Sequence, residues 1–241
     1  MLRLITDFDG PIMDVSERYY RVYQIGLEQV GRPDQPLNCL SKADFWELKR
    51  AQVPERQIGR MSGLDESQAE TFARYRRKTV HTLPYLKYDQ PVPGAIATLE
   101  RIQSLGIDLA VMTMRREREL DDAFARYDLG RFFPSDRRYC LSNDYVKTSD
   151  VEDKPLLMER AMAELPPASN WMIGDTEADL AAAHRYSIKA IAVLSGIRNR
   201  EQLSHHAPHY IVDHLAAAVD LVVDHLAAAV DLVLHHENMT P

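Results

Sequence analysis

Residues 2–10 read LRLITDFDG and decide the fold class of this chain. The apolar and β-branched first half is typical of a buried strand, and two carboxylates follow where that strand ends. Because side chains alternate along an extended segment, Asp7 and Asp9 lie on the same side, and Gly10 then allows a sharp turn. Taken alone, the motif fits either a reactive carboxylate pair or two solvated acids on a turn.

Short apolar runs and helical patterns alternate through most of the chain. Further strands are expected at 108–113, 139–142, 171–175, 188–194 and 210–212. Helices are expected near 94–105, 117–127, 155–164 and 177–185. This alternation predicts an α/β fold with a parallel sheet, in which ligands bind at the carboxyl ends of the strands.

Residues 15–89 interrupt the alternation. Tyr19, Tyr23 and Leu27 recur at every fourth position, which predicts mostly helical structure. The proline-rich return QPVPG at 90–94 indicates a hinge. We therefore expect a helical cap that lies over the strand ends as a lid. The expected division is a core of residues 1–14 and 90–241 and a cap of residues 15–89.

Composition places the chain among ordinary globular proteins, with 241 residues, 45% apolar and 27% charged. No apolar run is long enough to cross a bilayer and no signal peptide is recognised, so no membrane association is expected. Cys39 and Cys140 belong to no motif, which favours a reduced, cytoplasmic protein.

The net charge of −7 is unevenly distributed. Residues 15–88 hold 13 Lys and Arg against 9 Asp and Glu, whereas the remainder holds 16 against 27. Nucleic-acid binders usually show much stronger basic patches. A segment 15–88 with a net charge of +4 therefore suits a small anionic metabolite and argues against a nucleic-acid partner.

Three further polar groups stand at strand ends or helix starts. Thr113 ends an apolar run, and its hydroxyl can donate to a phosphate oxygen or serve in a turn. Lys154 lies in Asp153-Lys154-Pro155, which we expect to open a helix with Pro155 at its first position. The helix dipole does not favour an ammonium group there, so an opposing anion or carboxylate is expected.

Asp175 and Asp179 lie four residues apart in GDTEAD, at a strand-to-helix junction. Both carboxylates can face the strand ends. Hard oxygen ligands suit Mg²⁺, which pairs with substrate phosphates. An acidic helix start without a metal is the alternative.

Together these motifs resemble the signature of the haloacid dehalogenase (HAD) superfamily: Asp-x-Asp, a strand-terminal Thr or Ser, a Lys, and Gly-Asp-x-x-x-Asp. The match covers residues 2–194. It implies a doubly wound, Rossmann-like core with an inserted helical cap, as in the subclass of phosphoglycolate phosphatase and β-phosphoglucomutase. Pro11 departs from the usual Thr or Val, and because proline fixes φ, the loop after Gly10 can differ.

The resemblance implies a role for each matched position. Asp7 would be the nucleophile and Asp9 the general acid and base, with Thr113 and Lys154 holding the phosphoryl group. The implied Mg²⁺ ligands are Asp7, the Asp9 carbonyl and Asp175, with Asp179 supporting the metal site or Lys154. The expected substrate-binding residues are Gly10, Met114 and Arg115 in the core and Arg56 and Arg60 in the cap.

The function expected from this resemblance is Mg²⁺-dependent hydrolysis of a small phosphomonoester through an aspartyl phosphate. A sugar phosphomutase is the nearest alternative. A 2-haloacid dehalogenase is disfavoured, because its chemistry needs neither the acid Asp9 nor a metal at Asp175. A non-catalytic binding or scaffold protein is disfavoured, because every catalytic position is filled.

Residues 212–222 read VDHLAAAVDLV, and residues 223–233 repeat them without a change. Eleven residues are almost three helical turns, so a second copy continues a helix with its apolar stripe nearly in line. We expect an extended helix or helix-mediated self-association.

Overall fold

The computed structural model describes residues 1–237 of the chain, with side chains described as far as Ala228. Its core is a six-stranded parallel sheet in the order β5-β4-β1-β6-β7-β8. The strands are β1 (Leu2–Thr6), β4 (Asp108–Arg116), β5 (Arg138–Leu141), β6 (Ser169–Gly174), β7 (Lys189–Val193) and β8 (Tyr210–Val212). The chain order reverses beside β1, so the expected doubly wound α/β fold is confirmed.

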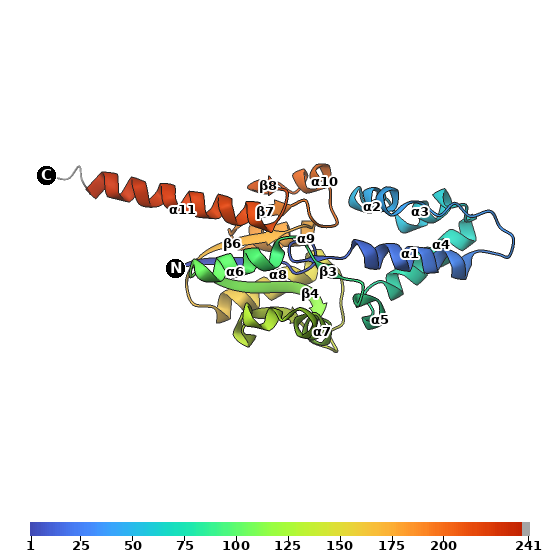
Figure 1. Cartoon of the computed structure of the whole chain (residues 1–241), viewed down its shortest axis with the longest axis horizontal. Helices are drawn as coiled ribbons and strands as arrows, with labels where there is room; N and C mark the ends of the chain where they lie inside the picture. The colour runs from blue at the N-terminus through green and yellow to red at the C-terminus, as the bar shows by residue number, and fades with distance from the viewer. Residues whose placement is uncertain (238–241) are drawn as a thin grey trace.

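Helices cover both faces of this sheet (Figure 1). One face packs against α6 (Ala95–Ser104), α7 (Glu117–Tyr127) and α11 (Leu215–Glu237), and the other against α8 (Asp150–Glu164) and α9 (Glu177–Arg185). Leu4 and Ile5 of β1 are both fully buried and belong to the two opposite clusters. Helices cover both faces of β1, so neither face of the strand is polar. This explains the nearly unbroken run of apolar residues in β1. Short helices η1 (Leu129–Arg131), η2 (Ser135–Arg137) and α10 (Arg200–Ser204) lie in the connections.

Five helices form a separate body beyond the carboxyl end of β1 (Figure 1). They are α1 (Ser16–Val30), α2 (Lys42–Arg50), α3 (Glu55–Met61), α4 (Glu66–Thr79) and α5 (Leu83–Leu86). The chain leaves and returns through two short antiparallel strands, β2 (Met13–Asp14) and β3 (Gln90–Pro91). This cap has its own apolar cluster, in which Tyr23, Phe45 and Phe72 are fully buried.

The cap also contacts the core away from its linkers. Arg50 Nη2 donates to the carbonyl oxygen of Leu194 at 3.0 Å, and Gln52 Nε2 donates to Glu177 Oε1 at 3.2 Å. Leu194 directly follows β7, and Glu177 is the first residue of α9, which follows β6. The cap therefore closes over the strand ends.

Helix α8 begins earlier than the sequence pattern suggested. It begins at Asp150, where the Ser149 side chain accepts a hydrogen bond from the N–H of Glu152, and Pro155 lies inside it. The expectation that Pro155 opens the helix was therefore wrong. Lys154 lies within the helix and is 1% exposed.

Helix α11 begins at Leu215 within the first copy of the repeat, continues through the second copy and extends away from the body (Figure 1). The first copy buries Leu215, Ala218, Val219 and Val222 against the core. Leu226, the second copy's counterpart of Leu215, is 49% exposed. The extended helix is thus present, whereas self-association stays a prediction. Among the described helices, none combines the length and apolarity that a membrane span needs.

Candidate active site

A cavity of about 790 Å³ lies between the cap and the strand ends. From the core it is lined by Asp7, Asp9, Thr113, Lys154 and Asp175, together with Met114 and Arg115. The cap contributes Arg18, Tyr19, Arg77, Lys78 and His81. All four catalytic residues expected from the sequence therefore meet in one place.

Asp7 follows β1 and is 6% exposed. Its Oδ1 accepts a hydrogen bond from the N–H of Phe8 at 2.7 Å and lies 2.9 Å from Lys154 Nζ. Within residues 1–237, no hydrogen bond reaches its Oδ2. One oxygen is held and the other is available for reaction.

Asp179 supports this arrangement from the start of α9. Its Oδ2 accepts hydrogen bonds from the N–H of Asp175 at 3.1 Å and from the N–H and hydroxyl of Thr176 at 2.9 and 2.8 Å. Its Oδ1 forms an ion pair with Lys154. Both carboxylate oxygens of Asp179 already have partners. Asp179 is therefore better placed to orient Lys154 than to bind a metal.

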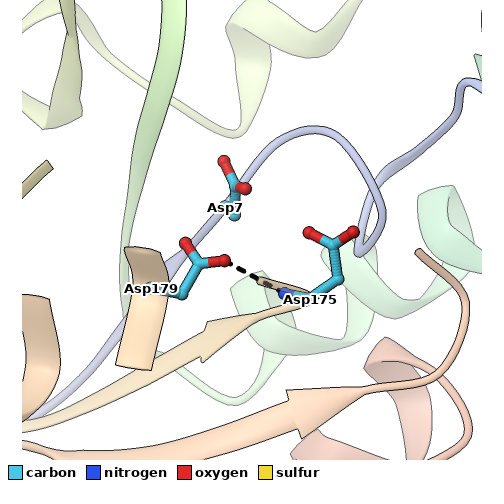
Figure 2. Close-up of side chains that lie close together, drawn as sticks. All are labelled: Asp7, Asp175 and Asp179. Atoms are coloured by element: carbon cyan, nitrogen blue, oxygen red, sulfur yellow. Dashed lines mark hydrogen bonds between the residues drawn. The ribbon is translucent and has the colours of Figure 1, made fainter. Parts of the chain in front are cut away.

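Figure 2 shows the carboxyl groups of Asp7, Asp175 and Asp179 gathered from three segments around one space. One oxygen of each lies within 4.8 Å of the others. Asp175 Oδ2 accepts from the N–H of Ile197 at 2.7 Å, whereas its buried Oδ1 has no hydrogen-bond partner among the described residues. Such an orphaned carboxylate oxygen fits a divalent cation with oxygen ligands.

The raised pKa values of Asp175 and Asp7 also favour a bound cation. Burial, reinforced by the charge of Asp179, raises the pKa of Asp175 to about 7. Burial also raises the pKa of Asp7 well above its usual range, although Lys154 opposes that shift. Three carboxylates face a single lysine, so a divalent cation would relieve their repulsion.

The close approach of the Asp175 side chain explains why residue 10 is a glycine. Its φ is +93°, and a Cβ atom there would meet the carboxylate of Asp175. The turn uses the N–H groups of Gly10, Ile12 and Met13, so Pro11 removes no hydrogen bond from it. The departure from the family pattern at Pro11 is accommodated.

The carboxylate of Asp9 points away from the acidic cluster. Its Oδ1 lies 2.6 Å from Arg115 Nη2, and its Oδ2 lies 3.0 Å from Arg18 Nη2. Burial alone would raise the pKa of Asp9, but Arg115 and Arg18 outweigh it and lower that pKa to about 2. The expected metal ligation through the Asp9 carbonyl oxygen stays a prediction.

Some expected contacts are not formed. Arg56 and Arg60 do not line the cavity; they are exposed and form ion pairs with Glu66. Their expected substrate contact has no support in this arrangement, because the α3–α4 packing turns them outward. Conversely, sequence reasoning missed Arg18 and Asp89, which no motif marks.

Comparisons with known proteins agree with this geometry. A family model described as HAD-hydrolase-like matches residues 153–218, which include Lys154, Asp175 and Asp179. The chain is 25% identical over 221 residues to a phosphoglycolate phosphatase of Pseudomonas syringae pv. tomato, covering 88% of this chain and 76% of that one. The chain is similar in sequence to proteins of the HAD superfamily. A phosphoglycolate phosphatase of Synechococcus elongatus is 24% identical over 221 residues and is covered to 93% of its length.

The fold is shared as well. A haloacid dehalogenase-like family hydrolase of Streptococcus pneumoniae superposes with a TM-score of 0.66 at 19% identity, covering 92% of this chain and 98% of that one. At this identity the likeness concerns the fold alone. The shared fold extends over nearly the whole length of both chains.

Proposed function

We propose that this protein is a Mg²⁺-dependent phosphatase that hydrolyses a small phosphomonoester through an aspartyl phosphate on Asp7. The observation that carries the proposal is the state of the Asp7 carboxylate. One oxygen is fixed by Phe8 and Lys154, and the other is available inside a cationic cavity.

In the first step a carboxylate oxygen of Asp7 attacks phosphorus and displaces the alcohol oxygen of the substrate. The new bond joins Asp7 to phosphorus as the bond to the leaving oxygen breaks. Thr113 and Lys154 line the place where the phosphoryl oxygens would lie. Asp9, on the cap side of Asp7, would protonate the leaving oxygen.

In the second step water attacks the phosphorus of the aspartyl phosphate. Asp9 takes the proton from that water, inorganic phosphate leaves, and the carboxylate of Asp7 is restored. In the resting site the pKa of Asp9 is lowered to about 2, so its carboxylate is ionised and can accept this proton. The acid role requires Asp9 to gain a proton once substrate is present.

The metal would be held by Asp7 and Asp175, with the Asp9 carbonyl implied by the family. When bound, Mg²⁺ neutralises negative charge on the phosphoryl group and on the carboxylates around it. Asp179 keeps Lys154 directed at Asp7.

The charge of the cavity suits an anionic substrate. Nine Lys and Arg side chains line it against five Asp and Glu, although the whole chain has a net charge of −7. Because two curated relatives are phosphoglycolate phosphatases, we propose a phosphomonoester of similar size and charge as the first candidate.

A panel of phosphomonoesters tests the proposal. Wild type with Mg²⁺ should release inorganic phosphate from phosphoglycolate, sugar phosphates or nucleotides, and a chelator should stop the release. Asp7→Asn should be inactive; activity equal to wild type would contradict the proposal. Transfer of the phosphoryl group to a sugar without phosphate release would identify a mutase.

Self-association through the repeat is a separate proposal. It rests on the second copy, which carries the same residues that the first copy buries against the core. Light scattering of the full chain and of a variant lacking residues 223–233 would decide it. An unchanged monomeric mass would remove the proposal.

A further inference from the structure

Four charged side chains form a closed ring beside the catalytic carboxylate. Arg115 contacts both Asp9 and Asp89, and Arg18 contacts both as well. Arg18 Nε lies 3.1 Å from Asp89 Oδ1, and Arg18 Nη2 lies 3.0 Å from Asp9 Oδ2. Charges alternate around the ring, so each arginine bridges two carboxylates.

The ring joins parts of the chain that the cap separates. Asp9 follows β1, Arg18 lies in the first cap helix, Asp89 lies in the linker that returns from the cap, and Arg115 lies near the end of β4. Ring closure therefore ties the first cap helix and the returning linker to the core at the position of Asp9. Cap placement and Asp9 placement are coupled.

Asp89 is the most deeply buried carboxylate of the ring. Its side chain is 1% exposed, against 26% for Asp9. The hydroxyl of Tyr127 donates to its carbonyl oxygen at 2.7 Å, which fixes the linker on α7. Asp89 is thus an anchored carboxylate that accepts a hydrogen bond from Arg115 and forms an ion pair with Arg18.

Asp89 does not line the cavity and cannot touch the reacting atoms. Arg18 and Arg115 do line it, and both reach Asp9. A planar guanidinium has donors in a fixed fork, so the direction of one contact sets the direction of the other. Fixing an arginine on Asp89 therefore fixes where it holds Asp9.

We propose that Asp89 is a positioning residue for Asp9, acting through Arg18 and Arg115. This inference rests on the proposed phosphatase activity. Without the carboxylate of Asp89, both arginines turn entirely to Asp9 and draw its carboxylate away from the leaving oxygen. Proton delivery to the leaving group should then suffer more than the attack by Asp7.

The leaving group separates these two effects. An alkyl phosphate needs a proton on its departing oxygen, whereas p-nitrophenyl phosphate loses a stable phenolate and needs little help. The value of kcat/KM covers only the steps through phosphoryl transfer to Asp7. The informative quantity is therefore the ratio of kcat/KM for phosphoglycolate to that for p-nitrophenyl phosphate.

Asp89→Asn should lower this ratio about 10-fold or more, in the same direction as Asp9→Asn, for which losses of about 10² to 10⁴ are typical of a general acid. Asp89→Glu, which restores the charge, should recover part of the ratio. Should Asp89→Asn fail to fold, Arg18→Lys gives the same readout, because lysine keeps the charge without the fork.

Asp108 offers a matched control. It also accepts from two arginines, Arg3 at 2.6 Å and Arg137 at 2.9 Å, but at the opposite end of β4 from Arg115. Asp108→Asn should leave the ratio within about twofold of wild type, since it cannot reach Asp9. A similar fall in the ratio would show that the loss of any carboxylate paired with two arginines has this effect and would overturn the inference.

An active wild type with an unchanged ratio in Asp89→Asn would overturn the role of Asp89 alone. A wild type inert toward both esters would overturn the proposed phosphatase activity and the role of Asp89 with it. The expected result is that Asp89→Asn loses kcat/KM for phosphoglycolate more than for p-nitrophenyl phosphate, and that Asp108→Asn shows no such selective loss.

Discussion

Lys154 Nζ lies 2.9 Å from Oδ1 of Asp7, and both side chains are almost entirely buried. A buried ammonium group is costly unless it is paired, and this one is shared between Asp7 and Asp179. Burial tends to lower the pKa of Lys154, but the two carboxylates raise it above its usual range. The lysine is therefore charged at every working pH and links the nucleophile to α9.

Lys154→Met should abolish measurable phosphatase activity while keeping a side chain of similar length. Loss of the cation leaves two buried carboxylates without their partner, and removing one member of a buried pair costs about 3–5 kcal/mol. Chemical denaturation of the metal-free variant at pH 7.5 measures that loss. A variant as stable and as active as wild type would contradict this role.

Asp179 and Asp175 should behave differently when each is changed to Asn. Asp175→Asn should weaken Mg²⁺ binding, because it removes the negative charge of the carboxylate whose Oδ1 has no hydrogen-bond partner among the described residues. Asp179→Asn should lower kcat about 10-fold or more with little change in Mg²⁺ affinity, because it disturbs Lys154 rather than the metal. Calorimetric titration of both variants with Mg²⁺ checks the difference; equal weakening would make Asp179 a ligand.

Stability of the metal-free protein should fall as pH rises toward 7. The pKa of Asp175 is raised to about 7 by burial and by Asp179, so the folded state binds a proton that the unfolded state has lost. That contribution is fully present below pH about 4 and is lost as pH rises through about 7. Mg²⁺ should therefore raise Tm more at pH 8 than at pH 5.5. A Tm increase that is larger at pH 5.5 would be inconsistent with this site.

Gly10→Ala should destroy the metal site. The added Cβ meets the carboxylate of Asp175, and φ at this position is +93°. Gly94→Ala is the matched control, since φ there is +81° but, among residues 1–237, no atom beyond the adjoining residues lies within 4 Å of the added Cβ. Both variants carry a cost of about 1 kcal/mol for the left-handed conformation, and only Gly10→Ala should lose Mg²⁺-dependent activity. Comparable activity in the two variants would argue against the close packing of Gly10.

Much of the core could be predicted because strand and helix periods act locally. Helices at 117–127 and 177–185 begin and end where the pattern placed them. Their caps explain the agreement, since Thr176 and Asp179 form a local capping box. The start of α8 was missed because Pro155 was taken as a boundary, whereas Ser149 provides the N-cap.

The cap residues show where sequence reasoning ends. Arg56 and Arg60 lie in a segment that resembles a substrate loop, yet Glu66 holds them at the surface. Asp89 and Arg18 are 71 positions apart and belong to no motif, so only the closed fold reveals their ion pair. Contacts between segments on either side of an inserted cap depend on how the cap packs, and no local pattern records that packing.

Trapping the covalent intermediate tests the central claim most directly. Wild type quenched in acid during turnover of a phosphomonoester with Mg²⁺, then digested and analysed by mass spectrometry, should carry one phosphoryl group on the peptide that contains Asp7. Asp7→Asn should carry none. A phosphoryl group on another residue, or undiminished turnover in Asp7→Asn, would contradict the assignment of Asp7 as the nucleophile.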